Sequence, residues 1–240
     1  MLSGMARVNS SIWYSQYECN MQSGLIGKFF MLSHKFMEKR YKGSDYFETV
    51  LELGATNFKH VQHVKHKFGK YILTDIKSFE ALQLVEEYRT KGLPLFKNVY
   101  FEEADARDLK RYKSNSIDRL IATCLILHLN SPKETLEEWR RVVRNSGGVL
   151  TFYVHCEPGA LLRLCRFLST NIKGKLKGQD HLAFVYLEHR NHFLAVKYAV
   201  REVFSNDEVK VSSFPFPGMS WNFNIWRIYH ITLGKDSESI

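Results

Sequence analysis

The sequence predicts an α/β fold: a Rossmann-like, doubly wound sheet of about seven strands, mostly parallel with an antiparallel last hairpin, preceded by an N-terminal helical cap. From residue 47 onward, short apolar runs alternate with amphipathic helical patterns, which is typical of a parallel sheet covered by helices. Near the end of the chain two strand-like runs follow each other, which favours an antiparallel pair at the sheet edge.

Three short apolar runs predict the first three strands, at residues 47–53, 71–74 and 98–102. The first helix is expected between the first two strands, because Asn57 can cap it, apolar residues then recur on one face, and Gly69 can end it. The second helix is expected to begin at Ser78 and to stop at Gly92, before the third strand.

The best-specified helix follows the fourth strand, which is expected over residues 117–124. Ser131 and Glu134 predict a capping box with proline at the first helical position. The glycine pair at 147–148 is expected to end this helix before a fifth strand over 149–154. Its predicted core stripe consists of Leu136, Trp139, Val142 and Val143.

The rest of the chain does not continue this regular alternation of strands and helices. Helical patterns cover residues 160–168 and about 182–203, and the two final strands are expected at 208–213 and 225–232. No linker rich in proline or serine separates these parts, so we expect a single domain over residues 1–240. Its expected parts are a helical cap (1–44), a core (45–155), an insert (156–207), a terminal hairpin (208–234) and a flexible tail (235–240).

Composition narrows the class of protein. The chain has 34 Lys and Arg against 25 Asp and Glu, a net charge of +9, which strengthens the case for an anionic partner, although a surplus of solvated lysines is the commoner explanation. Its 4 cysteines form no Cys-x-x-Cys pair, so neither zinc nor a disulfide scaffold is expected. Without a run of eighteen apolar residues or a signal peptide pattern, we expect no membrane span and a cytoplasmic location.

Acidic residues end three neighbouring strands of the predicted sheet. Glu52 lies just before Gly54 at the end of the first strand, Asp75 closes the second, and Asp105 follows the third. Ligands of an open parallel sheet bind beyond the carboxyl ends of its strands, and one carboxylate can accept hydrogen bonds from both hydroxyls of a ribose. This arrangement suits a nucleoside.

Six short motifs follow one another along the predicted sheet: VLELG at 50–54, TD at 74–75, ADARDL at 104–109, SID at 116–118, LHL at 127–129 and RRVVRNSGG at 140–148. In order and spacing this set resembles the class I S-adenosylmethionine-dependent methyltransferases, in particular the small-molecule branch known as methyltransferase type 11. The similarity covers about residues 47–155. Where the family has Gly-x-Gly-x-Gly, this chain keeps only Gly54.

The resemblance implies that S-adenosylmethionine is the cofactor and S-adenosylhomocysteine the product. It implies that Glu52 and Gly54 line the methionine part of the cofactor, that Asp75 binds the ribose, and that Asp105 with Ala106 faces the adenine. The full set of expected cofactor-binding residues is Glu52, Gly54, Ala55, Asn57, Asp75, Ile76, Asp105, Ala106 and Cys124, the last near the sulfonium.

Histidines supply candidates for a general base. His128 lies just past the fourth strand, and His189 and His192, spaced i and i+3, are expected to share one helix face, with Glu188 able to fix one imidazole tautomer. Local hydrogen bonding at a solvated helix end is the plainer interpretation. The aromatic residues Tyr14, Tyr17 and Trp221 are candidates for the substrate pocket, although core packing explains them equally well.

These observations favour an O- or N-methyltransferase of a small polar metabolite, for instance a phosphorylated compound, a sugar or a nucleotide-linked sugar. Two alternatives stay open. Methylation of RNA is consistent with the charge of +9 and with aromatic residues that could stack on bases. A catalytically inactive binding protein with the same fold is consistent with the missing glycines after Gly54.

Overall fold

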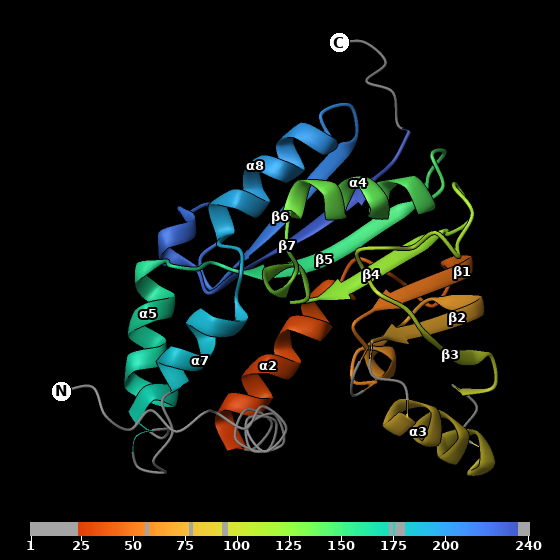
Figure 1. Cartoon of the computed structure of the whole chain (residues 1–240), viewed down its shortest axis with the longest axis horizontal. Helices are drawn as coiled ribbons and strands as arrows, with labels where there is room; N and C mark the ends of the chain where they lie inside the picture. Colours follow the sequence, from red (N-terminus) through yellow and green to blue (C-terminus); the bar gives the residue numbers. More distant parts are fainter. Residues whose placement is uncertain are drawn as a thin grey trace.

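The computed structural model describes residues 24–55, 58–76, 79–92, 96–172, 175 and 181–234. It contains a seven-stranded sheet with the strand order β3-β2-β1-β4-β5-β7-β6 (Figure 1). The strands are β1 (Tyr46–Leu53), β2 (Lys67–Asp75), β3 (Val99–Glu103), β4 (Arg119–Thr123), β5 (Val149–His155), β6 (Glu208–Phe214) and β7 (Trp226–Thr232). The first five are parallel, and β7 is antiparallel to β5 and β6, so the predicted fold class is confirmed.

Helices cover both faces of the sheet, which gives the molecule three layers (Figure 1). None of the helices described is long and apolar enough to cross a membrane. The helices are α2 (Gly24–Met37), α3 (Phe79–Thr90), α4 (Pro132–Val142), α5 (Ala160–Arg166), α7 (His181–Glu188) and α8 (Phe193–Val203). Short helical turns are η1 (Val61–His63), η3 (Ile126–His128), the π-helical η4 (Phe167–Asn171) and η5 (Trp221–Phe223).

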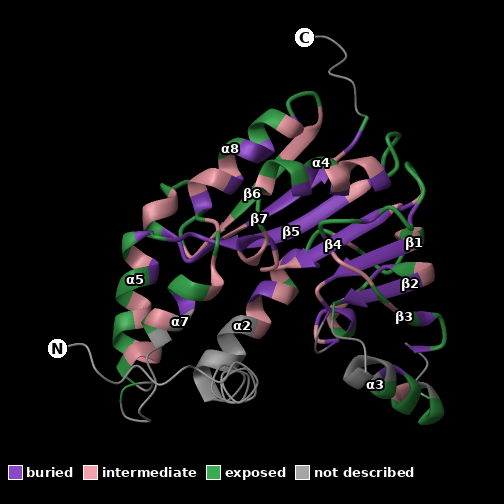
Figure 2. Ribbon diagram, in the orientation of Figure 1, coloured by how far each residue is buried: buried purple, intermediate pink, exposed green. Residues whose placement is uncertain are grey.

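Alternate residues of the central strands point to opposite faces, as the pleat of a strand requires. Leu120 of β4 belongs to the core that α4 and α8 complete, with Trp139 of α4 fully buried in it. Ile121, the next residue, belongs to the core on the face covered by α2 and α3. Because both faces are covered, the central strands are buried along most of their length (Figure 2).

The predicted helix between the first two strands is wrong. Among the described residues between β1 and β2 only the turn η1 is helical, and β2 already begins at Lys67, where it pairs in parallel with Tyr46 of β1. Phe58 has a φ of +50°, a left-handed conformation that an α-helix of L-residues does not propagate. Pairing with a strand twenty residues earlier therefore overrides a local helical pattern. The predicted cap at Asn57 lies outside the described residues.

Helix α4 keeps its predicted core stripe but not its predicted ends. Ser131 has a φ of +50° and its side chain caps no backbone N–H, so the capping box is wrong. The helix also stops at Val142, before the glycine pair, because Val143 turns extended and bridges to Ile117 while Arg144 N–H donates to the Ile117 carbonyl at 2.8 Å. The predicted final hairpin is confirmed, with β6 as its outer strand.

A fully buried ion pair joins α2 to the middle of the sheet. Glu38, one residue after α2, accepts from Arg119 Nη1 at 3.0 Å, and both side chains are completely buried. His60 Nε2 lies 3.0 Å from the other Glu38 oxygen, and the guanidinium stacks 3.7 Å from the centre of the Tyr41 ring. Burial opposes ionisation, but the Arg119 charge still holds the pKa of Glu38 below its ordinary value.

Replacing Glu38 by Gln should destabilise the protein strongly, because the substitution leaves the Arg119 guanidinium buried without its counter-charge. We expect the unfolding free energy to fall by about 3 to 5 kcal/mol, measured by urea denaturation. Lys91→Ala, which breaks the exposed pair with Glu87, is the matched control and should leave the unfolding free energy nearly unchanged. Similar effects of the two substitutions would contradict a structural role for the buried pair.

Candidate functional site at the carboxyl ends of the strands

The strand order reverses between β1 and β4, and both strands end at the same edge of the sheet. Gly54 ends β1 with a φ of +68°, and a Cβ added there would lie 3.0 Å from Cδ1 of Leu125, just past β4. Cys124, which follows β4, also has a positive φ, +55°. Both turns are therefore tight, and they place the chain after β1 directly against the chain after β4, where ligands of such sheets bind.

The neighbouring strands end at the same level, as their register requires. Ala55 N–H donates to the Thr74 carbonyl at 2.9 Å, and Ala104 N–H donates to the Asp75 carbonyl at 3.1 Å. Asp75 is buried at the end of β2, whereas the Ile76 side chain after it is 63% exposed. The structure thus brings the predicted residues Gly54, Ala55, Asp75 and Ile76 to one rim, while Asn57 lies outside the described residues.

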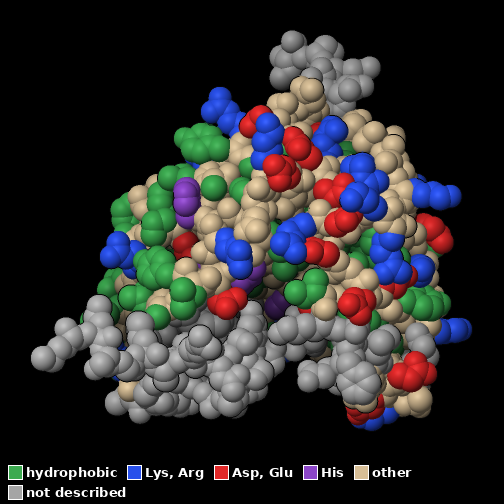
Figure 3. All heavy atoms as spheres, viewed as in Figure 1, with side chains coloured by type: hydrophobic (Ala, Val, Ile, Leu, Met, Phe, Trp, Pro, Cys, Tyr) green, Lys and Arg blue, Asp and Glu red, His purple; other side chains and the backbone are tan. Residues whose placement is uncertain are grey.

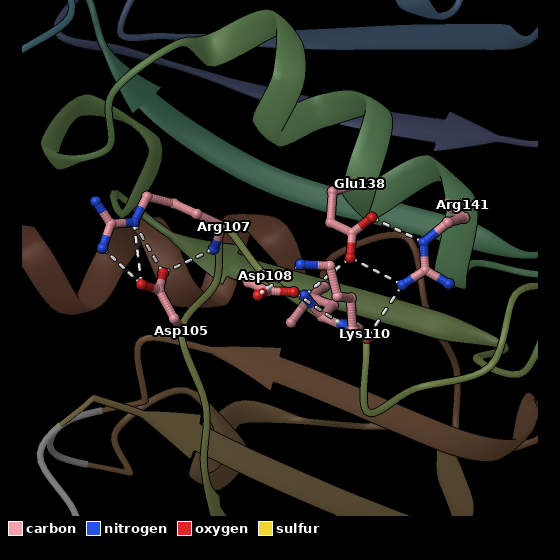
Figure 4. A network of polar contacts seen from close by, with 7 residues as sticks. Asp105, Arg107, Asp108, Lys110, Glu138 and Arg141 are labelled. Atoms are coloured by element: carbon pink, nitrogen blue, oxygen red, sulfur yellow. Dashed lines mark hydrogen bonds and ion pairs between the residues drawn. The ribbon is translucent and has the colours of Figure 1, made fainter.

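The loop after β3 is held in place by ion pairs (Figure 4). The Asp105 carboxylate accepts hydrogen bonds from Arg107 at its backbone N–H (2.9 Å), Nε (2.9 Å) and Nη2 (2.6 Å). The hydrogen bonds from Arg107 lower the pKa of Asp105. Ala106 is buried, and its carbonyl accepts from Trp139 Nε1 at 2.8 Å. Arg107 was not identified from the sequence. A ligand that binds Asp105 must share the carboxylate with Arg107 or displace it.

The same loop is fastened to α4 by Glu138. Its Oε1 accepts from Leu109 N–H at 2.8 Å, and Arg141 donates both to Glu138 at 2.7 Å and to the Leu109 carbonyl at 3.1 Å (Figure 4). Glu138 and Arg141 of α4 therefore position the rim. The arrangement fixes Asp105 and Ala106 relative to the core of the sheet.

Glu52 is buried against β2. The hydroxyl of Tyr71 donates to Glu52 Oε2 at 2.6 Å, and Thr74 Oγ1 donates to the Glu52 carbonyl at 3.0 Å. Burial raises the pKa of this carboxyl group. The structure therefore explains Glu52 first as a partner of Tyr71 inside the sheet, and its predicted contact with the methionine part of the cofactor stays a prediction.

A second cluster lies beyond the ends of β4 and β5 and centres on the buried carboxylate of Glu157. His189 Nδ1 lies 2.6 Å from Glu157 Oε2, His155 Nδ1 lies 3.7 Å from Oε1, and Arg166 pairs with the same Oε1. The ring of His128 stands edge-on to that of His189, with 4.6 Å between the centroids. Two of the three predicted histidines, His128 and His189, are thus brought together.

His192 lies apart from this cluster, and its predicted helix face shared with His189 is wrong. The stretch around 182–203 is two helices, because Arg190 and Asn191 between them donate their backbone N–H groups to the Leu127 carbonyl at 2.7 and 3.1 Å. His192 is exposed at the start of α8, where its Nδ1 accepts from Ala195 N–H at 3.3 Å. The acid beside His189 is Glu157, not the predicted Glu188.

Sequence reasoning missed Glu157, although a signal existed: it is the single acid in the apolar stretch that follows the fifth strand. Burial disfavours its ionised form, yet the hydrogen bonds from His155 and His189 and the charge of Arg166 lower the pKa of Glu157. Burial also lowers the pKa of His155. Burial raises the pKa of Cys124 to about 12, and its Sγ lies 3.6 Å from His155 Nδ1. The cluster thus holds an ionised carboxylate beside a neutral thiol.

A cavity of about 470 Å³ adjoins this cluster, between α5 and α7, and Glu157 is one of its lining residues. The predicted pocket residue Trp221 lies in η5 and stacks on Phe193 of α8, with 5.6 Å between the ring centroids. This contact places Trp221 against the core. The other two predicted pocket residues, Tyr14 and Tyr17, lie outside the described residues.

Residues 51–151, which include the strand ends described above, match the family model described as "Methyltransferase domain". These residues form a methyltransferase domain. The predicted family and cofactor are therefore confirmed. The matched range ends inside β5, so the Glu157 cluster draws His155, Arg166 and His189 from the part of the chain beyond it.

Individual proteins also resemble this chain in sequence or in structure. A stretch of 77 residues is 32% identical to "Thiol S-methyltransferase TMT1B" of Homo sapiens, and the match spans 30% of this chain and 31% of that protein. A SAM-dependent methyltransferase of Thermotoga maritima, described as a possible histamine N-methyltransferase, is 17% identical with a TM-score of 0.56, over 92% of this chain and 96% of its own.

Another solved structure, geranyl diphosphate methyltransferase in complex with SAM, has a TM-score of 0.55 and 9% identity, over 84% of each chain. At these identities the solved structures show the fold alone. The names of these proteins refer to a thiol, to histamine and to geranyl diphosphate, so the methyltransferase domain by itself does not define an acceptor.

The side chain of His128 is expected to make the stability of the folded protein depend on pH. Burial, and then the neighbouring His189, lower the pKa of His128 from 6.5 to about 4. Between these values the unfolded chain binds a proton at this position that the folded protein does not, so the unfolding free energy falls as the pH falls.

We expect His128→Gln to flatten this decline by about 1.4 kcal/mol per pH unit, measured by urea denaturation at several pH values inside that window. Wild-type protein measured in the same buffers is the control. An identical slope in the variant and the wild type would show that His128 does not remain neutral on folding.

Proposed function

We propose that this chain transfers the methyl group of S-adenosylmethionine to a proton-bearing heteroatom of a small molecule, and that His189 acts as the general base. The observation that carries the proposal is the hydrogen bond of 2.6 Å between His189 Nδ1 and the buried Glu157 carboxylate. This pair lies beyond β4 and β5, on the side of the rim next to Cys124.

The ionised state of Glu157 decides which ring nitrogen of His189 donates to it. The lowered pKa of Glu157 keeps the carboxylate ionised, so it only accepts hydrogen bonds, and Nδ1 of His189 must be the donor. A neutral His189 then carries its lone pair on Nε2, the form that can take a proton from an acceptor. Glu157 positions the ring and stabilises the imidazolium that results from proton transfer.

The residues of the rim fit a nucleoside cofactor. Gly54 has the positive φ that lets the backbone turn closely past Leu125. Asp75 would bind the ribose hydroxyls, and the exposed side chain of Ile76 would lie against the adenine. When bound, S-adenosylmethionine supplies a methyl group already activated by its sulfonium. The protein then needs only to orient the acceptor, exclude water and remove a proton.

We also propose a cytoplasmic location and a small-molecule partner. Three cysteines in the described part of the chain, Cys124, Cys156 and Cys165, are free thiols, which is consistent with a reducing compartment. The small-molecule substrate is supported by the cavity beside Glu157, whose volume of about 470 Å³ suits one small ligand.

Asp75→Ala tests the cofactor site. Losing a charged partner of two ribose hydroxyls should raise the dissociation constant for S-adenosylhomocysteine about tenfold or more, measured by isothermal titration calorimetry. Asp108→Ala, which removes an exposed acid from a neighbouring loop, is the control and should bind like the wild type. No binding to the wild-type protein would instead support an inactive member of the family.

His189→Gln tests the base. Release of S-adenosylhomocysteine would be followed with a thiol, a phenol, a primary amine and a short single-stranded RNA as acceptors, and the best would be kept. We expect kcat/KM for a hydroxyl or thiol acceptor to fall about a hundredfold or more, with unchanged binding of S-adenosylhomocysteine.

His192→Gln is the matched control for this test, because it removes an exposed histidine from the same linker. It should keep the wild-type rate. A His189→Gln variant at full rate would remove His189 from the mechanism, and turnover of RNA alone would replace the small-molecule acceptor by a nucleic acid.

A further inference from the structure

We infer that the cavity between α5 and α7 binds an amphiphilic acceptor, with an apolar body in the cavity and an anionic group at Arg163. The inference rests on the proposed function for the role of this ligand as acceptor, but its binding is testable without any turnover. The described residues that line the cavity include Glu157, Leu162, Arg163, Arg166, Asn171 and Leu182.

The lining is mostly apolar and much of it is open to solvent. Leu164 and Phe167 are 54% and 60% exposed, and Leu182 and Tyr186 on the facing helix are 45% and 63% exposed. Hydrophobic side chains gather over α5 and α7 in the space-filling view (Figure 3). Large apolar side chains of two adjoining helices that stay exposed around one hollow are typical of a ligand site.

Polar groups of the cavity point to a second feature of the ligand. Among its described lining residues, two guanidinium groups, Arg163 and Arg166, accompany one carboxylate, Glu157. Arg166 neutralises Glu157 directly. The exposed Arg163 therefore supplies the excess positive charge, which favours an anionic group on the ligand.

Asn171 gives an independent sign of a ligand. It lines the cavity, and its buried Oδ1 has no hydrogen-bond partner in the described part of the chain. A buried acceptor left without a donor is costly, so a hydroxyl or amine of a ligand would satisfy it. Asn171 ends the π-helical turn η4, a conformation that is frequent at functional sites.

The cavity leads to the proposed base through one shared residue. Glu157 lines the cavity, and its Oε2 holds His189 Nδ1 at 2.6 Å. A molecule whose apolar body occupies the cavity would thus reach the carboxylate that holds the histidine. This arrangement favours acceptors with an apolar chain or ring over fully polar sugars.

The test uses octanoate and 1-octanol, which share one apolar chain and differ in charge. Their binding to the full-length protein would be measured by displacement of the fluorescent probe 1-anilinonaphthalene-8-sulfonate, without cofactor. We expect Leu182→Gln to weaken octanoate binding about fivefold to tenfold. Leu187→Gln, on the same helix but outside the cavity and 71% exposed, is the matched control and should bind normally.

Two further results decide the inference. Arg163→Ala should remove the preference for octanoate over 1-octanol, and octanoate should inhibit methyl transfer competitively with the acceptor found above. Equal losses in Leu182→Gln and Leu187→Gln would show adsorption to the exposed apolar surface and overturn the inference. Binding without inhibition would overturn the acceptor role, whereas a fully active His189→Gln variant would overturn only the proposed base.

Discussion

The buried carboxylate of Glu157 is the constraint on which the candidate site depends. A buried charge is costly unless it is paired and hydrogen-bonded, and its partners come from three different elements: His155 from β5, Arg166 from α5 and His189 from the linker between α7 and α8. Satisfying one carboxylate therefore holds the helices of the insert to the end of the sheet. The same contacts orient an imidazole and form one wall of a cavity.

Two buried charge clusters in the described part of the chain serve different purposes. Glu38 and Arg119 are completely buried, between α2 and the sheet, so their pairing stabilises the fold and leaves no room for a ligand. Glu157 is equally well paired but lines a cavity that is open to a small molecule. Both carboxylates are well paired, so pairing does not separate their roles. The open cavity beside Glu157 is what makes it a candidate catalytic carboxylate.

Local patterns in the sequence predict the ends of β1 and β2 well, because an apolar run followed by an acid specifies where a buried strand stops. They fail where a distant partner decides the conformation. Lys67 joins a strand because it pairs with Tyr46, and the helical stretch breaks at Arg190 because its N–H reaches Leu127. For the same reason, His189 could be predicted as a candidate base, but its pairing with Glu157, thirty-two residues away, could not.

The loss of two glycines after Gly54 does not by itself argue for an inactive protein. A glycine is needed where φ is positive or where a Cβ has no room, and Gly54 meets both conditions. The two lost glycines correspond to positions 56 and 58. Position 56 lies outside the described residues. Phe58 has a φ of +50°, and its side chain is fully buried in the core on the face of α2 and α3. The chain therefore keeps a left-handed conformation at the position of the third glycine while using a large side chain for packing.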